Sequence, residues 1–184
     1  MTQMPTPQEP GTMRYALGDA DDPVSQEIKD LCLGIRLEVF VGEQHVPFEE
    51  EVDLLDEAGS TLHILATDAE GNPLGTARLL QDPDHLGQVH LGRLAVVKEA
   101  RGTGLGARLV REVETMALVG GSVPITDSFG QPTGEGEVTV ILSAQEQAMG
   151  FYSKLGYEVV SGESYLDAGI PHQDMARVVR GPVR

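Results

Sequence analysis

The residues best suited to bind a ligand lie between His90 and Leu118. This stretch, HLGRLAVVKEARGTGLGARLVREVETMAL, passes from an apolar, β-branched run through a basic, glycine-rich turn into an amphipathic segment. A helix N-terminus has unpaired N–H groups and a partial positive charge, and glycines let an anion reach those groups without meeting a Cβ. Arg101-Gly-Thr-Gly-Leu-Gly106 therefore predicts an anion site, for which a diphosphate is the best-fitting ligand.

Three other interpretations of this turn have to be weighed. The P-loop pattern G-x-x-x-x-G-K-[ST] is absent, which argues against a P-loop nucleotidase. Gly102, Gly104 and Ala107 formally match the dinucleotide pattern G-x-G-x-x-[G/A], but that pattern should open a doubly wound sheet whose next strand ends in an acid. Here the turn falls past mid-chain, and the strand VTVIL is followed by Ser143. A tight turn without a ligand is the remaining alternative.

The elements that must position the turn are predicted from apolar spacing and turn residues. Asp22 and Pro23 are typical of a helix start, and apolar residues follow at helical spacing. Residues 40–60 are expected to be an irregular acidic loop, and residues 119–137 an inserted loop. Strands are expected at Met13–Leu17, Thr61–Thr67, Pro73–Leu80, Val138–Leu142, Tyr157–Val160 and Asp174–Val179, with a short helix ending at Gly156. This order predicts an α/β or α+β domain with a mixed sheet.

Composition narrows the class of protein. With 184 residues, one domain over 11–184 is expected after a disordered lead-in at 1–10. Cys32 is the one cysteine, so no intrachain disulfide is possible; a core thiol and a cytoplasmic setting are expected. The net charge of −16 argues against nucleic-acid and anionic-membrane binding and favours cationic partners, including amines. No metal site is expected.

Two further motifs carry a resemblance to a known family. Arg101 to Gly106 fits [RQ]-x-x-G-x-[GA], the pyrophosphate loop of the GNAT acyltransferase superfamily, and the preceding LAVV resembles its fourth strand. AQEQAMGFYSKLGYE resembles the motif that follows its fifth strand. LEVFVGEQHVPFEEEVD, HLGRLAVV and GESYLDAGIPHQDM resemble the ElaA-like branch. The resemblance implies a mixed, mostly antiparallel central sheet flanked by helices, with a splay between the fourth and fifth strands.

The resemblance also implies site residues for acetyl-CoA. The backbone of Leu94, Ala95 and Val96 would align the pantetheine arm, and Tyr152 would be the general acid that meets the departing sulfur. Because a free tyrosine is a weaker acid than a thiol, Tyr152 is expected to stabilise the thiolate by a hydrogen bond. The remaining cofactor-binding residues would be Arg101, Gly102, Thr103, Gly104, Leu105, Gly106, Ala107, Gln145, Phe151 and Lys154. Gln145 stands where many relatives have Asn.

The acceptor side is less defined by the sequence. Substrate contacts are expected from the acidic segment, at Phe40, Glu43, Gln44 and Glu50. The candidate bases are Glu43, Glu50, Glu51, His63 and His90, with a water relay as the alternative. His172 is expected to be a surface or structural residue. Three arginines, Arg36, Arg78 and Arg93, would bind a substrate carboxylate or pair with the many acids.

The sequence therefore predicts an N-acetyltransferase that moves an acetyl group from acetyl-CoA to a primary amine of a small molecule: an amino sugar, polyamine or amino-acid derivative. A protein or peptide amino group is the alternative acceptor, and a non-catalytic acyl-CoA-binding module is the alternative function. A nicotinamide-dinucleotide binder ranks last. The chain is expected to be a monomer or homodimer.

Overall fold

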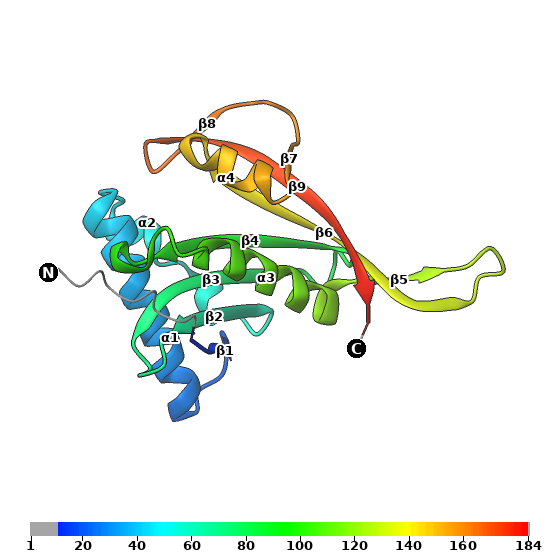
Figure 1. Ribbon diagram of the computed structural model, residues 1–184, viewed down its shortest axis with the longest axis horizontal. Coiled ribbons are helices and arrows are strands. Elements are labelled where there is room, and N and C mark those ends of the chain that lie inside the picture. The colour runs from blue at the N-terminus through cyan, green and yellow to red at the C-terminus, as the bar shows by residue number, and fades with distance from the viewer. Residues whose placement is uncertain (1–10, 184) are drawn as a thin grey trace, which may run out of the picture. The chain divides into compact units, whose positions relative to one another are not determined.

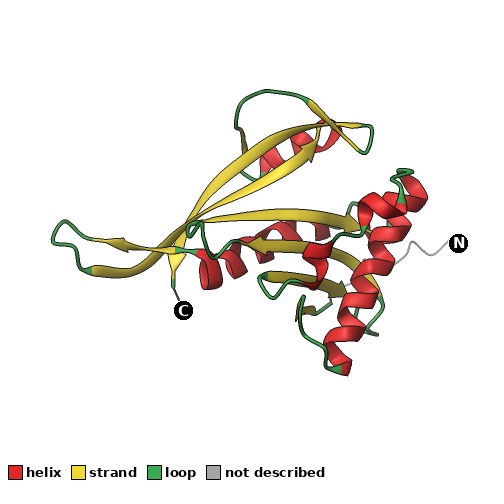
Figure 2. Ribbon diagram, turned by 180° about the vertical axis from the view of Figure 1, so that it is seen from behind, coloured by secondary structure: helices red, strands yellow, loops and turns green. Residues whose placement is uncertain are grey.

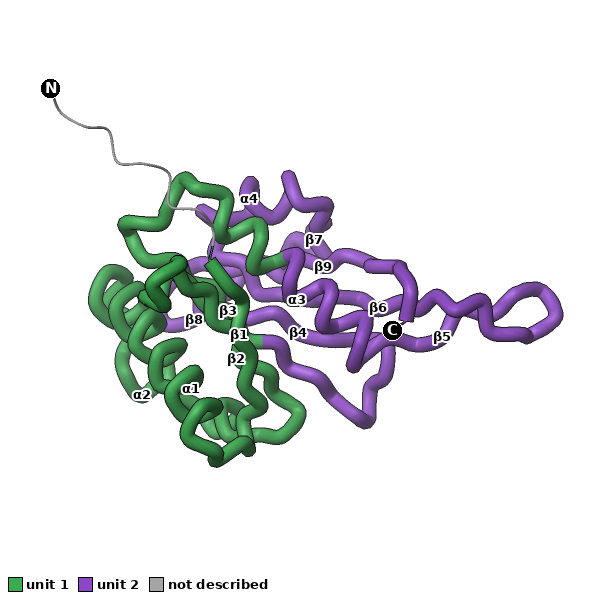
Figure 3. The backbone as a smooth tube through the Cα atoms, turned by 60° about the horizontal axis from the view of Figure 1, so that its bottom comes forward, with its two compact units in different colours: residues 1–78, 93–110 green, residues 79–92, 111–184 purple. Residues whose placement is uncertain are grey.

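The computed structural model describes residues 11–183 (Figure 1). The predicted lead-in at 1–10 lies outside the described residues. Two compact units make up the described chain (Figure 3): residues 11–78 with 93–110, and residues 79–92 with 111–183. Three elements, β3, β4 and α3, begin in one unit and end in the other. The prediction of a single domain stays a prediction.

The elements alternate broadly as the sequence predicted. The first half of the chain contains β1 (Met13–Leu17), α1 (Pro23–Arg36), the π-helical η1 (Leu37–Glu43), α2 (Phe48–Glu51), the 3-10 turn η2 (Leu54–Glu57), β2 (Thr61–Thr67), β3 (Pro73–Gln81) and β4 (Gln88–Val96). The second half contains η3 (Lys98–Ala100), α3 (Leu105–Gly121), β5 (Val123–Thr126), β6 (Pro132–Gln145), η4 (Glu146–Ala148), α4 (Met149–Lys154), β7 (Glu158–Val159), β8 (Tyr165–Asp167) and β9 (Ile170–Pro182).

The strands form one mixed sheet with the order β1-β2-β3-β4-β6-β9-β7, and β5 and β8 pair with β6 and β9. Pairing is antiparallel between β1 and β2, β5 and β6, β6 and β9, β7 and β9, and β8 and β9. β4 and β6 run parallel, with Gln88–Leu91 opposite Thr139–Leu142. The predicted mostly antiparallel mixed sheet is confirmed, and the splay stays a prediction.

In the first unit, helices cover both faces of the strands. α1 begins at Asp22, whose Oδ1 accepts a 3.0 Å hydrogen bond from the Ser25 amide. Its buried stripe includes Cys32, which is fully buried, so the predicted core thiol is confirmed; burial raises the pKa of this thiol to about 11. The start of α3 packs where Gly75 leaves room for Leu109. Figure 1 shows the start of α3 in front of the strands of this unit, and Figure 2 shows α1 on their other face.

Two predicted loops are wrong as irregular segments. Residues 37–57 form η1, α2 and η2 in close succession. Residues 119–137 complete α3 and then form a hairpin of β5 and β6, which Figure 1 shows extending from the second unit. The hairpin closes on Asp127, whose Oδ1 accepts from the amides of Phe129 and Gln131 at 2.9 Å each. The high glycine, proline and serine content of this stretch favoured a loop prediction and hid the pairing of β5 with β6.

Candidate functional site

The glycine-rich turn of the first unit has the backbone of an anion site. Gly102 and Gly104 have φ values of +78° and +83°, which L side chains rarely adopt, and a Cβ at either would meet nothing within 4 Å. Thr103 closes the turn by donating its hydroxyl to the Ala100 carbonyl at 2.6 Å. α3 starts at Leu105, so the first-turn amides of Leu105, Gly106 and Ala107 have no partner within the helix. The turn therefore offers an open set of N–H donors.

Arg101 and Glu43, predicted on the donor and acceptor sides, form an ion pair in the first unit. The Arg101 Nε also donates to the Val96 carbonyl at 3.0 Å. Both charged side chains are partly exposed, at 44% and 34%. An incoming diphosphate would have to share Arg101 with Glu43.

β4 contains one residue in the left-handed region, Arg93. This residue has φ of +53°, an uncommon conformation for a residue with a Cβ and one that costs energy unless its surroundings fix it. Its side chain supplies that restraint, because the Arg93 Nη2 donates to the Glu51 carbonyl at 3.1 Å and to the Glu50 carbonyl at 3.3 Å. Leu94–Val96, predicted to align pantetheine, follow directly.

A buried ion network lies beneath the acidic segment. Arg36 is 2% exposed and contacts Glu51 Oε1 at 2.7 Å and Asp56 Oδ1 at 2.8 Å. The other members are Arg78, which contacts Asp53 and Asp56 at 2.7 and 2.8 Å, and Arg93, which contacts Glu51 and Asp53 at 3.1 and 3.4 Å. Three guanidinium groups thus meet three carboxylates. Of the two predicted roles for these arginines, the structure has them paired with acids.

Asp56 joins Arg36 and Arg78 in this network. Burial would raise the pKa of its carboxyl, but hydrogen bonds and charge from Arg36 and Arg78 outweigh burial and lower it to about 2. The backbone carbonyl of Asp56 lies 2.8 Å from the ring Nε2 of His63 and forms a hydrogen bond with it. His63 is 3% exposed, and burial lowers the pKa of its imidazole. His63 and Glu51, both candidate bases, are thus buried in contact with residues of this network.

The outer side of the acidic segment stays exposed. Glu49 and Glu50 lie on α2 with Phe48, which is 53% exposed, and no described residue forms an ion pair with either carboxylate. Phe40 is partly buried, and Gln44 follows η1. His90, on β4 in the second unit, is exposed. The residues predicted to bind substrate are therefore of mixed character: Glu50 is open, whereas Glu43 is paired.

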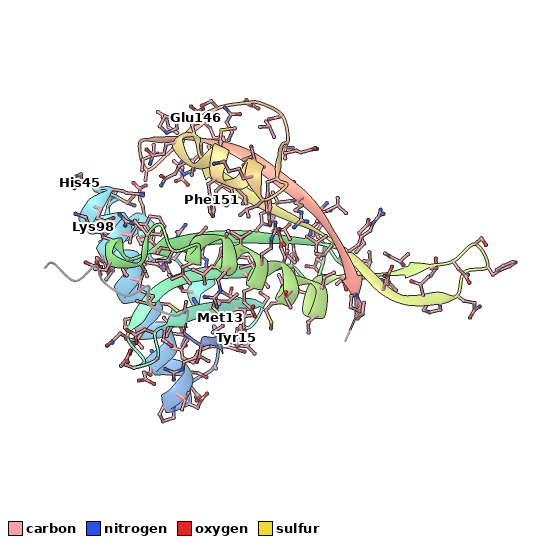
Figure 4. The ribbon with its side chains drawn as sticks, viewed as in Figure 1. Met13, Tyr15, His45, Lys98, Glu146 and Phe151 are labelled. Carbon is pink, nitrogen blue, oxygen red and sulfur yellow. The ribbon has the colours of Figure 1, made fainter. Side chains whose placement is uncertain are left out.

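In the second unit, α4 presents Tyr152 on its buried side. The side chain is 8% exposed, and burial raises the pKa of its phenol to about 12. Its ring meets Phe151 edge-on at 5.0 Å and Tyr157 at 5.9 Å. Figure 4 labels Phe151 on α4 and Glu146 at the start of the same segment. Phe151 and Lys154 are exposed, and their predicted contact with the cofactor stays a prediction.

The strands beside α4 carry two further residues named from the sequence. Gln145 ends β6, and its Oε1 accepts from Gln147 Nε2 at 2.8 Å. His172, opposite Gln145 on β9, is buried; its Nδ1 contacts the Ile170 carbonyl at 2.7 Å, and its ring stacks on Tyr165. A structural role for His172 agrees with these contacts.

Sequence reasoning missed one charged cluster completely. Glu114 on α3 is 5% exposed and accepts hydrogen bonds from Arg111, Tyr157 and Arg177. A charged residue beside the apolar stripe of α3 was the available signal, because a buried carboxylate requires partners. Among residues 11–183, no cluster of metal-ligating side chains is found, and no helix is long and apolar enough to cross a bilayer.

Comparison with known proteins assigns this chain to a family. The family model for the acetyltransferase (GNAT) domain matches residues 59–159. The uncharacterized N-acetyltransferase YjcF of Bacillus subtilis is 38% identical over 152 residues, covering 83% of this chain and 93% of YjcF. Protein ElaA of Escherichia coli is 32% identical over 148 residues, covering 80% of this chain and 85% of ElaA.

Solved structures agree with the sequence comparisons. An acyl-CoA N-acyltransferase from Pseudomonas aeruginosa superposes with a TM-score of 0.69 at 32% identity, covering 90% of this chain and 98% of that protein. The residues matched by the family model, 59–159, include the glycine-rich turn after β4 and α4. This chain belongs to the GNAT family of acetyltransferases, and acetyl-CoA is its acyl donor.

Proposed function

We propose that this acetyltransferase acetylates a primary amine of a small, cationic molecule. The amine nitrogen attacks the thioester carbon directly. The N–C bond forms, the C–S bond breaks with its electron pair on sulfur, and the amine loses one proton. The products are the amide and CoA.

The observation that carries the proposal is the charge balance of the acidic segment. Its three nearby arginines are matched by three buried or partly buried carboxylates. No guanidinium of this network is left over to hold a substrate carboxylate, whereas the exposed carboxylates of Glu49 and Glu50 add negative charge. A surface of that sign attracts ammonium groups and repels anions.

On the donor side, the proposal assigns the diphosphate to the amides of residues 101–107 and the pantetheine arm to the backbone of Leu94–Val96. The left-handed glycines at 102 and 104 support this assignment, because they keep the turn open to phosphate oxygens. Gln145, Phe151 and Lys154 are proposed to complete the cofactor contacts. Preorganised donors hold charge without reorganising during the reaction.

Tyr152 is proposed to stabilise the departing thiolate by donating a hydrogen bond. Its raised pKa keeps the phenol protonated throughout the working pH range. Of the candidate bases, Glu51 is engaged with Arg36 and Arg93, and Glu43 is paired with Arg101. Glu50 is therefore proposed as the residue that meets the amine, with a water relay carrying the proton where it does not reach.

A CoA-release screen tests the acceptor class. The panel contains a polyamine, an amino sugar, an amino-acid amide, the matching free amino acid and a lysine-containing peptide. We expect kcat/KM to be higher for the amide than for the free amino acid, because only the latter has a carboxylate. Preference for the peptide would favour the protein-acetylating alternative. Tight acetyl-CoA binding without CoA release from any amine would favour the non-catalytic module.

A pair of variants tests the proposed contact with the amine. Glu50→Gln should raise the KM of a cationic amine by about 3- to 5-fold, the range of one exposed charge pair, with little change in the KM of acetyl-CoA. Glu70→Gln is the matched control, because Glu70 is an exposed carboxylate in the turn between β2 and β3. Equal behaviour of the two variants would contradict the assignment of Glu50.

A further inference from the structure

The carboxylate of Glu114 is the most heavily engaged acidic group of the second unit. Glu114 is 5% exposed, and its Oε1 accepts from the Tyr157 hydroxyl at 3.1 Å. Its Oε2 accepts from Arg177 Nη1 at 2.8 Å, and Arg111 Nη1 lies 2.9 Å from each oxygen of the Glu114 carboxylate. Burying a charge is costly and adds little net stability even when it is paired. A role in fixing geometry is the better explanation for such a group.

The partners of Glu114 converge on the chain that leaves α4. Tyr157 belongs to this segment, and the Arg111 Nη2 donates a hydrogen bond to the Leu155 carbonyl at 3.2 Å. Gly156 lies close to Arg177, the third partner of Glu114. It has φ of +95°, and a Cβ there would lie 3.1 Å from Arg177 Nε. Residues 155–157 are therefore held by α3 and by β9 at once.

This segment is joined in turn to Tyr152. The amides of Leu155 and Tyr157 both donate to the Tyr152 carbonyl, at 3.0 and 3.1 Å. The Tyr157 ring meets the Tyr152 ring edge-on, with centroids 5.9 Å apart and planes at 71°. Tyr157 therefore contacts Tyr152 through backbone and ring, while its hydroxyl is anchored on Glu114. A continuous chain of contacts leads from the buried carboxylate to the phenol.

We propose that Glu114 is a positioning residue for Tyr152 and acts through Tyr157. The inference rests on the role of Tyr152 in the proposed function. Glu114 sets the position of the Tyr157 ring, and that ring sets the position of the Tyr152 hydroxyl against the leaving sulfur. Small displacements of a catalytic group lower turnover far more than they lower binding.

Tyr157→Phe is the sharper of two tests, because it keeps the ring and leaves Glu114 paired with both arginines. Glu114→Gln keeps the size of the side chain but replaces an acceptor oxygen with an amide that faces guanidinium groups. Each variant should lower kcat about 10-fold while changing the KM of acetyl-CoA less than twofold. Glu137→Gln, which breaks the exposed pair with Arg180 in the same unit, should leave both constants unchanged.

A double-mutant cycle distinguishes positioning from general destabilisation. If Glu114 acts through Tyr152, then Tyr157→Phe and Glu114→Gln should each cost less than twofold in kcat when Tyr152→Phe is already present. Equal losses with and without the Tyr152 hydroxyl would overturn the inference. If Glu114→Gln does not fold, the Tyr157→Phe cycle gives the same decision.

The cycle also separates this inference from the proposed function. A normal kcat for Tyr152→Phe alone would remove the role of Tyr152 and the inference with it. A reduced kcat for Tyr152→Phe, together with unchanged kcat values for Tyr157→Phe and Glu114→Gln, would overturn the positioning role alone.

Discussion

Replacing Tyr152 by phenylalanine tests whether this residue transfers a proton to the leaving thiolate or only donates a hydrogen bond to it. Burial raises the pKa of its phenol to about 12, whereas a thiol has a pKa of about 8.5. Full transfer to the thiolate would then be uphill by about 3.5 pKa units, or roughly 5 kcal/mol. A free tyrosine would have made it roughly 2 kcal/mol, so the structure strengthens the case for a hydrogen bond.

The expected loss follows from the strength of such a bond. A hydrogen bond to a charged group contributes about 1.5–3 kcal/mol, which corresponds to a fall in kcat of about 10- to 150-fold. The KM of acetyl-CoA should change little, because the thiolate exists only in the transition state and beyond it. Tyr15→Phe on β1 is the control, since β1 contains no proposed site residue.

The pH dependence supplies the refuting result. A group whose pKa is raised stays protonated until the pH approaches that pKa, so Tyr152 remains a donor up to about pH 12. CoA release by both enzymes is measured from pH 7 to pH 10, and the ratio of their kcat values should stay constant. If the advantage of the wild type disappears between pH 8 and pH 10, Tyr152 ionises in that range and the reasoning is wrong.

Three further predictions concern the first unit. Asp56→Asn should lower the free energy of unfolding by about 3–5 kcal/mol, measured by denaturant titration, because two buried guanidiniums lose their shared carboxylate. The pKa of Asp56 falls from 3.8 to about 2 on folding, so its contribution of roughly 2 kcal/mol is present above pH 4 and lost as the pH falls through 2. Acid unfolding of Asp56→Asn that matches the wild type would contradict this. Gly104→Ala should raise the KM of acetyl-CoA about 10-fold, because a left-handed residue with a Cβ costs about 1–2 kcal/mol; an unchanged KM would argue against the turn as the diphosphate site. Glu43→Gln should lower the Kd of CoA by about 2- to 5-fold in calorimetry, because it frees Arg101; a weaker Kd would mean that Glu43 orients the guanidinium instead.

Much of the fold follows from local patterns in the sequence. β1 and β2 run as predicted, α1 begins at the predicted Asp22 cap, and the predicted amphipathic segment is α3, which buries Leu105, Leu109 and Val113. These elements are set by periodicity and capping, which act over a few residues. The glycine turn was likewise predictable, because its positive φ values strongly favour glycine.

The ion network was not predictable as a unit, since its members are distant in sequence. Arg36 and Asp56 are 20 residues apart, and Arg78 and Asp53 are 25 apart. The acids of residues 43–57 therefore seemed solvated when considered alone. The signal lay with the arginines, which interrupt apolar strand and helix patterns. A guanidinium on a buried face needs a partner, so three such arginines beside an acidic segment indicate buried pairs.

The two buried charge clusters suggest why this enzyme retains charges in its interior. In the first unit, the contacts of the Arg93 side chain hold its left-handed backbone immediately before Leu94–Val96. In the second unit, Glu114 holds the segment that supports Tyr152. Well-packed apolar residues would be about as stabilising in either place, but they lack the directional contacts that fix a left-handed backbone residue or a ring orientation. Charge in these clusters is therefore expected to affect turnover as well as stability.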